Sequence, residues 1–408
     1  MPSAARASNV RQMNLALVLD VVRRHGPMSR SALVAATGLT RSAIAGLLAE
    51  LTDLRLVFEG APERDGSPGR PSPIVHIDDR HLGALAIEVF VDEIAASIVS
   101  LDGAIVTSMR RSRSRKRLSL GHTVRDVAAL VERVDDQRRS AGRFGPTRQI
   151  VGIGVSVPGL VRQTDNTILV APNLRWVDAD LAAPLAALLD NGLPIHVGND
   201  ADLGAVAEYR FGAGIGAEHM LYVSGEVGVG GGVIIRGEAL MGRSGSAGEI
   251  GHFPVNPDGI RCRCGAIGCW ETEVGERALL RRAGLPEDGG TPAVEKLIAL
   301  IEAGDVNVRR SLRAEARWLA IGLTGFINTF DPDRVVIGGL LGRLLPYLTA
   351  ELEAELELRR FRDAQRTVPV LGAQLGGDAT TVGAAWAGYL CAGRLCLCAR
   401  LRPTGGVA

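Results

Sequence analysis

The chain has 408 residues, of which 46% are hydrophobic, 22% charged and 4% aromatic, and its formal net charge is +1. This is a globular composition with room for two or three domains, and it argues against wholesale disorder. The balanced charge excludes binding to polyanions through the overall field, so any nucleic-acid contact must come from a local patch. No run of about 18 apolar residues is present, and the N-terminus lacks the apolar core of a secretory signal. We therefore expect a cytoplasmic protein with no membrane partner.

The first eighty residues carry the pattern of three short helices and a two-stranded ribbon. Ser29 can cap the second helix, which closes at Gly38, and Thr40 can cap the third. The short, glycine-containing turn between them is typical of a helix-turn-helix. The pattern predicts helices over 13–24, 29–38 and 40–54 and strands over 56–59 and 74–77.

We interpret residues 1–80 as a winged helix-turn-helix that binds double-stranded DNA. Residues 1–55 hold seven arginines against three acids, which is the right sign for contact with phosphates. In such modules the N-terminal part of the third helix enters the major groove. The residues expected to contact DNA are Thr40, Arg41, Ser42 and Ala43 in that helix and Arg70 in the wing. Two alternatives stay open: Arg41 faces solvent, or the helices serve only packing or oligomerisation.

Residues 81–390 show a different pattern, in which strand meanders alternate with crossover helices. This pattern predicts an α/β body of two lobes with a ligand cleft between them. Residues 391–408 are expected to form a tail outside that body. The predicted strands cover 82–90, 94–103, 104–112, 150–157, 194–199, 220–237, 333–339 and 368–373, with helices over 121–140 and 201–212.

The most specific local motif is a histidine followed by three closely spaced cysteines. His252, Cys262, Cys264 and Cys269 supply one imidazole and three thiolates, which is the donor set of a closed structural zinc site. The loop over 252–271 is therefore predicted to bind Zn²⁺ as a structural cofactor. The alternative is a set of reduced, buried thiols.

Carboxylates and an amide flank this loop and follow a predicted strand. Glu249 and Glu271 stand on either side of the zinc loop, and Asn199-Asp200 ends the strand over 194–199. Fixed carboxylates accept hydrogen bonds from neighbouring hydroxyls, so the set suits a polyol. Asp200 could act as the general base of a sugar kinase, or as the N-cap of the following helix. The glycine-rich turn over 225–232 is only a weak phosphate signal, because Glu226 would repel the ligand.

Together these motifs resemble the ROK family (repressors, open reading frames and kinases), which belongs to the actin-like ATPases with a ribonuclease H-like, two-lobed α/β body. A winged helix followed directly by this body is similar to the family's sugar-responsive transcriptional repressors. The resemblance covers roughly residues 10–390 and rests on the segments 155–161, 199–201, 228–232, 248–252, the cysteine loop and 331–339. It implies that the sugar contacts Asn199, Asp200, Glu249, His252 and Glu271, with Gly159 and Asn173 lining the same pocket.

Two positions depart from the pattern of the family's kinases. Kinases of the family open the first lobe with Asp-x-Gly-x-Thr, whereas this chain has Glu88-Val89-Phe90 with no glycine for a phosphate. Glu226 stands where kinases usually carry a threonine in the second phosphate turn. Phosphoryl transfer depends on positioning and charge neutralisation, so we expect no catalytic residues and no kinase activity.

The prediction is a sugar-responsive transcriptional regulator, a repressor by its resemblance, that binds a hexose or hexose derivative in a degenerate kinase cleft. Its expected partners are an operator in double-stranded DNA, a sugar effector and a second copy of the chain, as a homodimer or homotetramer. An alternative is an active ATP-dependent sugar kinase with an appended DNA-binding module, with Asp200 as its general base. Another is a zinc-stabilised DNA-binding protein without an effector.

Overall fold

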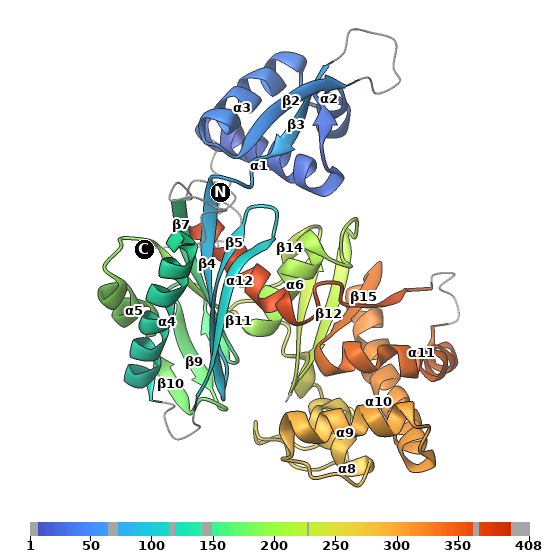
Figure 1. Cartoon of the computed structure of the whole chain (residues 1–408). Coiled ribbons are helices and arrows are strands. Elements are labelled where there is room, and N and C mark those ends of the chain that lie inside the picture. The colour runs from blue at the N-terminus through green and yellow to red at the C-terminus, as the bar shows by residue number, and fades with distance from the viewer. Residues whose placement is uncertain are drawn as a thin grey trace. The chain divides into compact units, whose positions relative to one another are not determined.

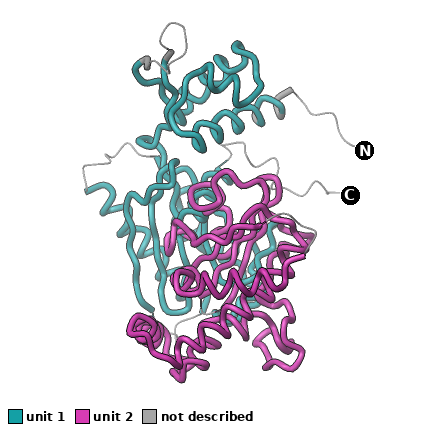
Figure 2. Tube along the Cα trace, turned by 90° about the vertical axis from the view of Figure 1, so that its right-hand side faces the viewer, with its two compact units in different colours: residues 1–199, 381–408 teal, residues 200–380 magenta. Residues whose placement is uncertain are grey.

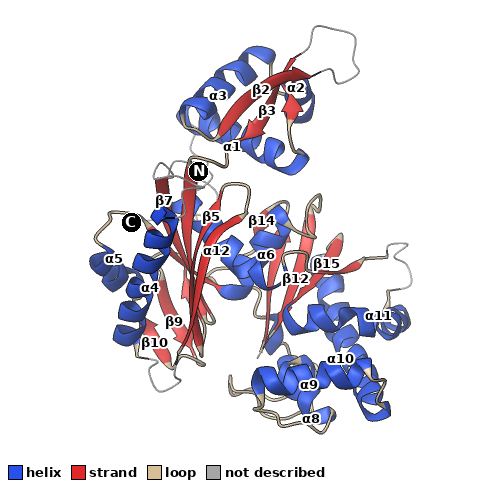
Figure 3. Cartoon of the chain, viewed as in Figure 1, coloured by secondary structure: helices blue, strands red, loops and turns tan. Residues whose placement is uncertain are grey.

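The computed structural model of the chain describes residues 7–63, 72–113, 119–140, 149–226, 228–361 and 367–392 (Figure 1). By its internal contacts the chain divides into two compact units (Figure 2). The first contains residues 1–199 and 381–408, and the second contains residues 200–380. Each unit contains a five-stranded mixed sheet with helices packed on it (Figure 3). The predicted mixed α/β fold is confirmed.

The three N-terminal helices form where their caps predict them. They are α1 (Ala7–His25), α2 (Arg30–Thr37) and α3 (Arg41–Asp53). The hydroxyls of Ser29 and Thr40 each accept a backbone hydrogen bond of 3.2 Å, from the amides of Ala32 and Ala43. Gly38 ends α2 in the left-handed conformation with φ of 69°, which glycine adopts without strain. One side of α3 is buried, as its apolar spacing predicts, through Ile44, Leu47, Leu48 and Leu51.

A two-stranded wing follows the third helix. Strands β2 (Val57–Glu63) and β3 (Ser72–Ile77) pair antiparallel, and a short strand β1 (Met28–Ser29) adds to the other edge of β3. The sequence analysis did not predict β1, because two residues show no periodicity. Arg70, the residue expected at the wing tip, lies outside the described residues.

Within the described residues, no single helix is long and apolar enough to cross a membrane; α2 and α3 pass that test only as a pair bent by 112°.

The sheet of the first unit has the order β11-β7-β4-β5-β6. Strands β4, β5 and β6 form the predicted antiparallel meander, and β7 and β11 extend it in parallel with β4. Helix α4 (Leu120–Ser140) packs on β5 and β6, while α12 (Ala379–Cys391) packs against β7. The strands are β4 (Leu82–Val89), β5 (Glu93–Ser100), β6 (Ile105–Ser112), β7 (Gln149–Val157) and β11 (Ile195–Asn199).

A second, small sheet in this unit was not predicted from the sequence. It has the order β10-β9-β8 and is followed by helix α5 (Ala182–Leu189). Its strands are three to five residues long, too short for their alternation to stand out. They are β8 (Leu160–Arg162), β9 (Thr167–Ala171) and β10 (Trp176–Ala179).

The sheet of the second unit has the order β14-β13-β12-β15-β16. Helix α6 (Asp200–Phe211) packs on β12 and β13, and α10 (Val306–Phe330) and α11 (Gly339–Arg359) also pack against β12. The strands are β12 (His219–Gly225), β13 (Val229–Ile235), β14 (Glu238–Ala239), β15 (Arg334–Gly338) and β16 (Val370–Gly372).

Short helices surround the core of the second unit. The buried Trp270 lies in that core and donates its indole N–H to the carbonyl of Trp318, at 2.9 Å. It therefore anchors the end of the cysteine loop to α10. The remaining helices are the 3₁₀ helices η2 (Ile250–His252) and η3 (Gly376–Asp378) and the α-helices α7 (Glu271–Val274), α8 (Glu276–Arg282) and α9 (Gly290–Glu302).

The contact between β7 and α12 yields a stability prediction. A Cβ atom on Gly154 would lie 1.7 Å from the carbonyl oxygen of Ala384, so Gly154→Ala forces the helix off the sheet. Overpacking of this kind costs about 1–3 kcal/mol. We expect a lower midpoint in urea unfolding followed by circular dichroism.

Gly121→Ala is the matched control for this substitution. In the same unit, a Cβ on Gly121 meets only the tip of the Arg125 side chain, at 3.7 Å. The control should leave the midpoint unchanged or raise it slightly, since alanine favours a helix by up to about 1 kcal/mol. Equal midpoints for the two variants would contradict the packing of α12 on β7.

Candidate functional site

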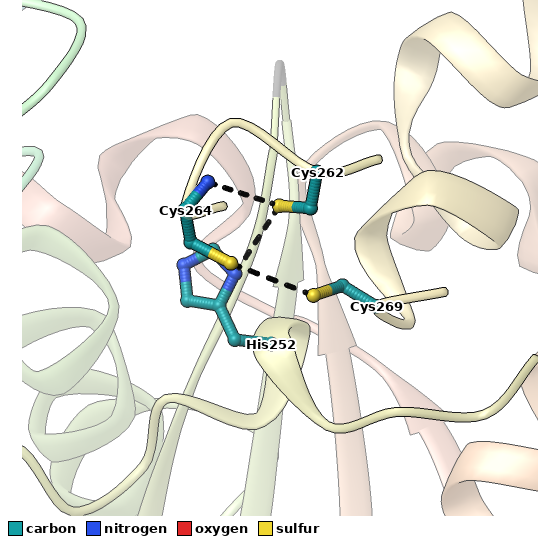
Figure 4. Close-up of side chains that lie close together, drawn as sticks. All are labelled: His252, Cys262, Cys264 and Cys269. Carbon is teal, nitrogen blue, oxygen red and sulfur yellow. Dashed lines mark hydrogen bonds between the residues drawn. The ribbon is translucent and has the colours of Figure 1, made fainter. Parts of the chain in front are cut away.

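The predicted metal ligands come together in the second unit. Figure 4 shows the side chains of His252, Cys262, Cys264 and Cys269 pointing toward one another. Their ligand atoms all lie within 4.8 Å of one another. The Sγ atoms of Cys264 and Cys269 are 3.6 Å apart, and the Sγ of Cys262 lies 3.7 Å from Nδ1 of His252. The cluster can hold a metal ion.

These separations fit the prediction of a tetrahedral zinc site. With Zn–S bonds of about 2.3 Å, the sulfur atoms at the corners of a tetrahedron lie about 3.7 Å apart. His252 presents Nδ1 to the thiols, while its Nε2 lies 3.7 Å from Oε2 of Glu249. A metal on Nδ1 would leave the proton on Nε2, where it faces a carboxylate, and such a partner orients a ligating histidine.

The backbone of the loop fixes these side chains. The amide of Cys262 donates to the carbonyl of Ala266 at 2.8 Å, which closes a turn in which Gly265 has φ of 97°. Gly251 lies against β13 so closely that a Cβ atom there would be 1.8 Å from the carbonyl oxygen of Val229. Only glycine at 251 lets the His252 segment pack against the sheet.

Two carboxylates flank the cluster, as the sequence predicts. Glu271, at the start of α7, lies 3.7 Å from Nδ1 of His252 and accepts a 2.8 Å hydrogen bond from the thiol of Cys262. Glu249 keeps 39% of its side-chain surface exposed, so it remains accessible to a ligand. Gly228 of the glycine-rich turn lies beside Glu271, because a Cβ atom there would be 2.9 Å from Oε2. The turn, the metal loop and α7 therefore converge at Glu271.

Asp200 is the first residue of α6 and faces the same group of acids. Burial raises the pKa of Asp200 to about 6; the amide of Ala201 opposes the shift, and the charge of Glu249 adds to it. Burial also raises the pKa of Asp202 well above its usual value, with further contributions from Glu249 and Asp200. Asp200 is the first helical residue and accepts a hydrogen bond from the next amide, of Ala201, at 2.9 Å; this is not the bond of an N-cap, which accepts from an amide two or three residues on.

The other predicted sugar ligands belong to the first unit. Asn199 ends β11, and its side-chain amide donates to the carbonyl of Gly159 at 3.0 Å. Gly159 packs closely on β9, because a Cβ atom there would lie 2.5 Å from the carbonyl oxygen of Val170. Asn173 lies in the turn between β9 and β10 and is partly buried.

A buried polar network behind the metal loop was not predicted from the sequence. Asn256, in the loop, donates to Glu273 at 2.8 Å, and Glu273 pairs with Arg282 at 3.1 Å. The same guanidinium pairs with Glu315 of α10 at 2.7 Å. Glu315 has no exposed side-chain surface. The network ties the loop to α8 and α10, but only the fold brings its members together from positions up to 59 residues apart.

In the first unit, the segment with the unusual Glu88-Val89-Phe90 sequence forms a tight hairpin. The Glu88 side chain is 1% exposed and accepts a 2.7 Å hydrogen bond from the hydroxyl of Thr381 on α12. Arg110 of β6 lies 3.5 Å from the same carboxylate. Arg113 is buried and donates to the hydroxyl of Thr123 and to the carbonyl of Phe90. Arg113 therefore fastens the hairpin.

Comparison with known proteins identifies the family. The sequence profile of the ROK family matches residues 84–388. The chain belongs to the ROK family. It is 29% identical over 377 residues to the xylose repressor of Bacillus subtilis, covering 92% of this chain and 94% of that protein. It is 30% identical over 327 residues to the glucokinase of Streptomyces coelicolor, covering 74% of this chain and 96% of that protein.

The same fold occurs in a solved ROK structure. The crystal structure of a ROK family transcriptional regulator, a homologue of the Escherichia coli MLC protein, matches with a TM-score of 0.77 at 23% identity. The match covers 95% of this chain and 96% of that one. The predicted fold, with an N-terminal module and a two-lobed ROK body, is confirmed.

The network behind the metal loop yields a second prediction. Arg282→Met removes the cation that pairs with two buried carboxylates, and breaking a buried pair costs about 3–5 kcal/mol. We expect a lower midpoint in urea unfolding of the full chain. Arg277→Met is the control on the same helix, because its partner Asp288 is 78% exposed and such pairs contribute about 1 kcal/mol or less. If the two variants unfold alike, the network does not stabilise this unit.

Proposed function

We propose that the protein is a sugar-responsive transcriptional repressor whose effector is a hexose or a hexose derivative. One observation carries the proposal: the chain joins a winged helix-turn-helix to a ROK body. The xylose repressor of Bacillus subtilis aligns over 92% of the chain and so extends into that module, whereas the Streptomyces coelicolor glucokinase aligns over 74%. A protein that only phosphorylates a sugar needs no DNA-binding module.

The DNA contacts come from the start of α3 in this proposal. Thr40, Arg41 and Ser42 are exposed at the N-terminus of the helix, while its other side is buried in the module. Arg41 is the long donor of the set, and it suits a guanine edge or a phosphate. Ala43 completes the contact surface, and Arg70 contributes from the wing. Two copies of the chain, in a homodimer or homotetramer, place two such helices on successive half-sites.

The sugar is held by hydroxyl-binding groups of the ROK body. In this proposal its ligands are Asn199, Asp200, Glu249, His252 and Glu271, with Gly159 and Asn173 lining the same pocket. Carboxylates and amides that face sugar hydroxyls accept hydrogen bonds, and a ligand without those hydroxyls leaves them unsatisfied. His252 serves both the sugar, through Nε2, and the metal, through Nδ1.

Zinc is the metal that best suits the cluster, and its role is structural. Three thiolates and one imidazole fill a tetrahedral coordination shell, which leaves no open position for a reacting water. The metal holds Glu271 and His252 in place on either side of the loop. The zinc site therefore supports sugar binding without taking part in a reaction.

We infer that ATP-dependent phosphorylation is not the protein's function. Glu88 is held by Thr381 and Arg110 inside the first unit, and Phe90 replaces the residue type that leaves space for a phosphate. Glu226 places a carboxylate in the second phosphate turn. Phosphoryl transfer depends on positioning and charge neutralisation, and here Phe90 replaces the glycine of the first turn while Glu226 adds a negative charge to the second.

The first functional test is DNA binding by the full-length protein. We expect it to retard a DNA fragment from its own upstream region, and one of the hexoses or N-acetylhexosamines to change the retarded fraction. Arg41→Ala should weaken DNA binding by about 1–3 kcal/mol and leave sugar binding in thermal-shift assays intact. Asp200→Asn should keep DNA binding and abolish the sugar response.

Two results would contradict this function. One is binding to unrelated DNA as tight as binding to the upstream region at every salt concentration. The other is ADP release with MgATP and a hexose that disappears in Asp200→Asn, which would establish the kinase alternative. Retardation that no sugar changes would instead favour a zinc-stabilised DNA-binding protein without an effector.

The metal yields a separate prediction. Elemental analysis of the purified protein should find about one zinc per chain, since the four ligands form one closed site. Cys264→Ser should lose that zinc, lower the unfolding midpoint and weaken sugar binding together. Cys391→Ser is the control, because Cys391 lies on α12 in the other unit. Wild-type protein that is free of metal and fully responsive to sugar would contradict the zinc assignment.

A further inference from the structure

We propose that the effector is an unphosphorylated sugar, and that Glu226 and Asp200 exclude sugar phosphates from its site. This inference rests on the proposed function and adds the chemical form of the ligand. It follows from the N-termini of two helices in the second unit, α6 and α11, which would attract an anion but already lie beside carboxylates of the protein.

Two long helices of the second unit begin next to the glycine-rich turn. The N-terminus of a helix attracts anions, because its free amides and its dipole favour negative charge there. Helix α6 starts with Asp200 and carries Asp202 in its first turn. The protein's own carboxylates therefore already satisfy the attraction of this helix end for an anion.

The start of α11 is covered in the same way, by Glu226. Gly225 and Gly339 form an isolated parallel bridge, which brings the glycine-rich turn against the first residue of α11. A Cβ atom on Gly339 would lie 2.7 Å from Oε1 of Glu226, so the carboxylate lies directly against the backbone there. No side chain caps this helix by a hydrogen bond. Glu226 thus holds a negative charge where a phosphate would otherwise bind.

Cations that could offset these charges are engaged elsewhere. Within the described ranges, no arginine or lysine forms an ion pair with Asp200, Glu226 or Glu249. Arg343 attracts Glu226 from a distance, but it pairs with Glu295 at 2.9 Å. A phosphate arriving here would therefore find like charges and no arginine or lysine to pair with; the nearby imidazole of His252 already faces Glu249 at 3.7 Å.

The position of the sugar makes this repulsion selective. In a kinase, the aspartate base faces the hydroxyl that receives the phosphoryl group. In this protein a hydroxyl at Asp200 can donate a hydrogen bond to the carboxylate. The same sugar with a phosphate on that oxygen would bring a charge of about −1.5 to −2 against Asp200 and Glu226. The free sugar fits, and its phosphate ester is repelled.

The test compares matched ligands on the full-length protein by isothermal titration calorimetry. The probes are glucose, mannose and N-acetylglucosamine, each with its 6-phosphate, at about pH 8 so that the carboxylates are charged. The pKa of Glu226 is raised to about 7 by burial, with further contributions from Asp200 and Glu276, and Arg343 opposes them. We expect the best free sugar to bind at least about tenfold more tightly than its 6-phosphate.

Glu226→Gln keeps the shape of the side chain and removes its charge. We expect the ratio of the two affinities to fall by about tenfold in this variant. Glu287→Gln is the control, since Glu287 pairs with Arg281 on the surface and is 44% exposed. Its ratio should equal that of the wild type.

Each outcome has a distinct meaning. A 6-phosphate that binds as tightly as its free sugar would overturn this inference and leave the sugar-responsive function standing. A wild-type preference for free sugar that Glu226→Gln does not change would overturn the role of Glu226. If no sugar binds in either form, the proposed function itself is wrong.

Discussion

The arrangement of this protein depends on carboxylates that are held close together without a matching number of cations. Asp200, Glu249 and Glu271 come from three different segments, and the metal loop and the start of α6 fix their positions. Such a set accepts hydrogen bonds from hydroxyls and repels anions. This is why the proposed ligand is a neutral polyol. The cysteine cluster lies beside this set, because Glu271 accepts a 2.8 Å hydrogen bond from the thiol of Cys262 and Glu249 lies 3.7 Å from Nε2 of His252.

In the first unit, two buried charged side chains hold a hairpin in place. Glu88 and Arg113 are buried, and each has partners within the protein: Thr381 and Arg110 for Glu88, and Thr123 and the carbonyl of Phe90 for Arg113. A buried charge with good partners stabilises one local conformation and tolerates little change. Buried charges of the first unit therefore stabilise a hairpin, whereas the carboxylates of the second unit belong to the proposed ligand site.

Sequence patterns within a few residues predicted much of this structure, whereas contacts between distant segments could not be predicted from the sequence. The caps Ser29 and Thr40, the strand meander and the metal-ligand spacing act over a few residues, so the sequence exposes them. The network of Asn256, Glu273, Arg282 and Glu315, and the bond between Glu88 and Thr381, join segments that meet only after folding. The small sheet β8–β10 was missed for another reason, since its strands are too short for alternation to appear.

The proposed sugar ligands lie at a point where the chain passes from one unit to the other. The first segment of the first unit ends at Asn199, and the second unit begins at Asp200. A ligand shifts a conformational equilibrium only through different affinities for the two states, and couplings of about 1–3 kcal/mol are typical. In the proposed function, binding of the sugar supplies this differential affinity. No chemical step is needed for a response of this kind.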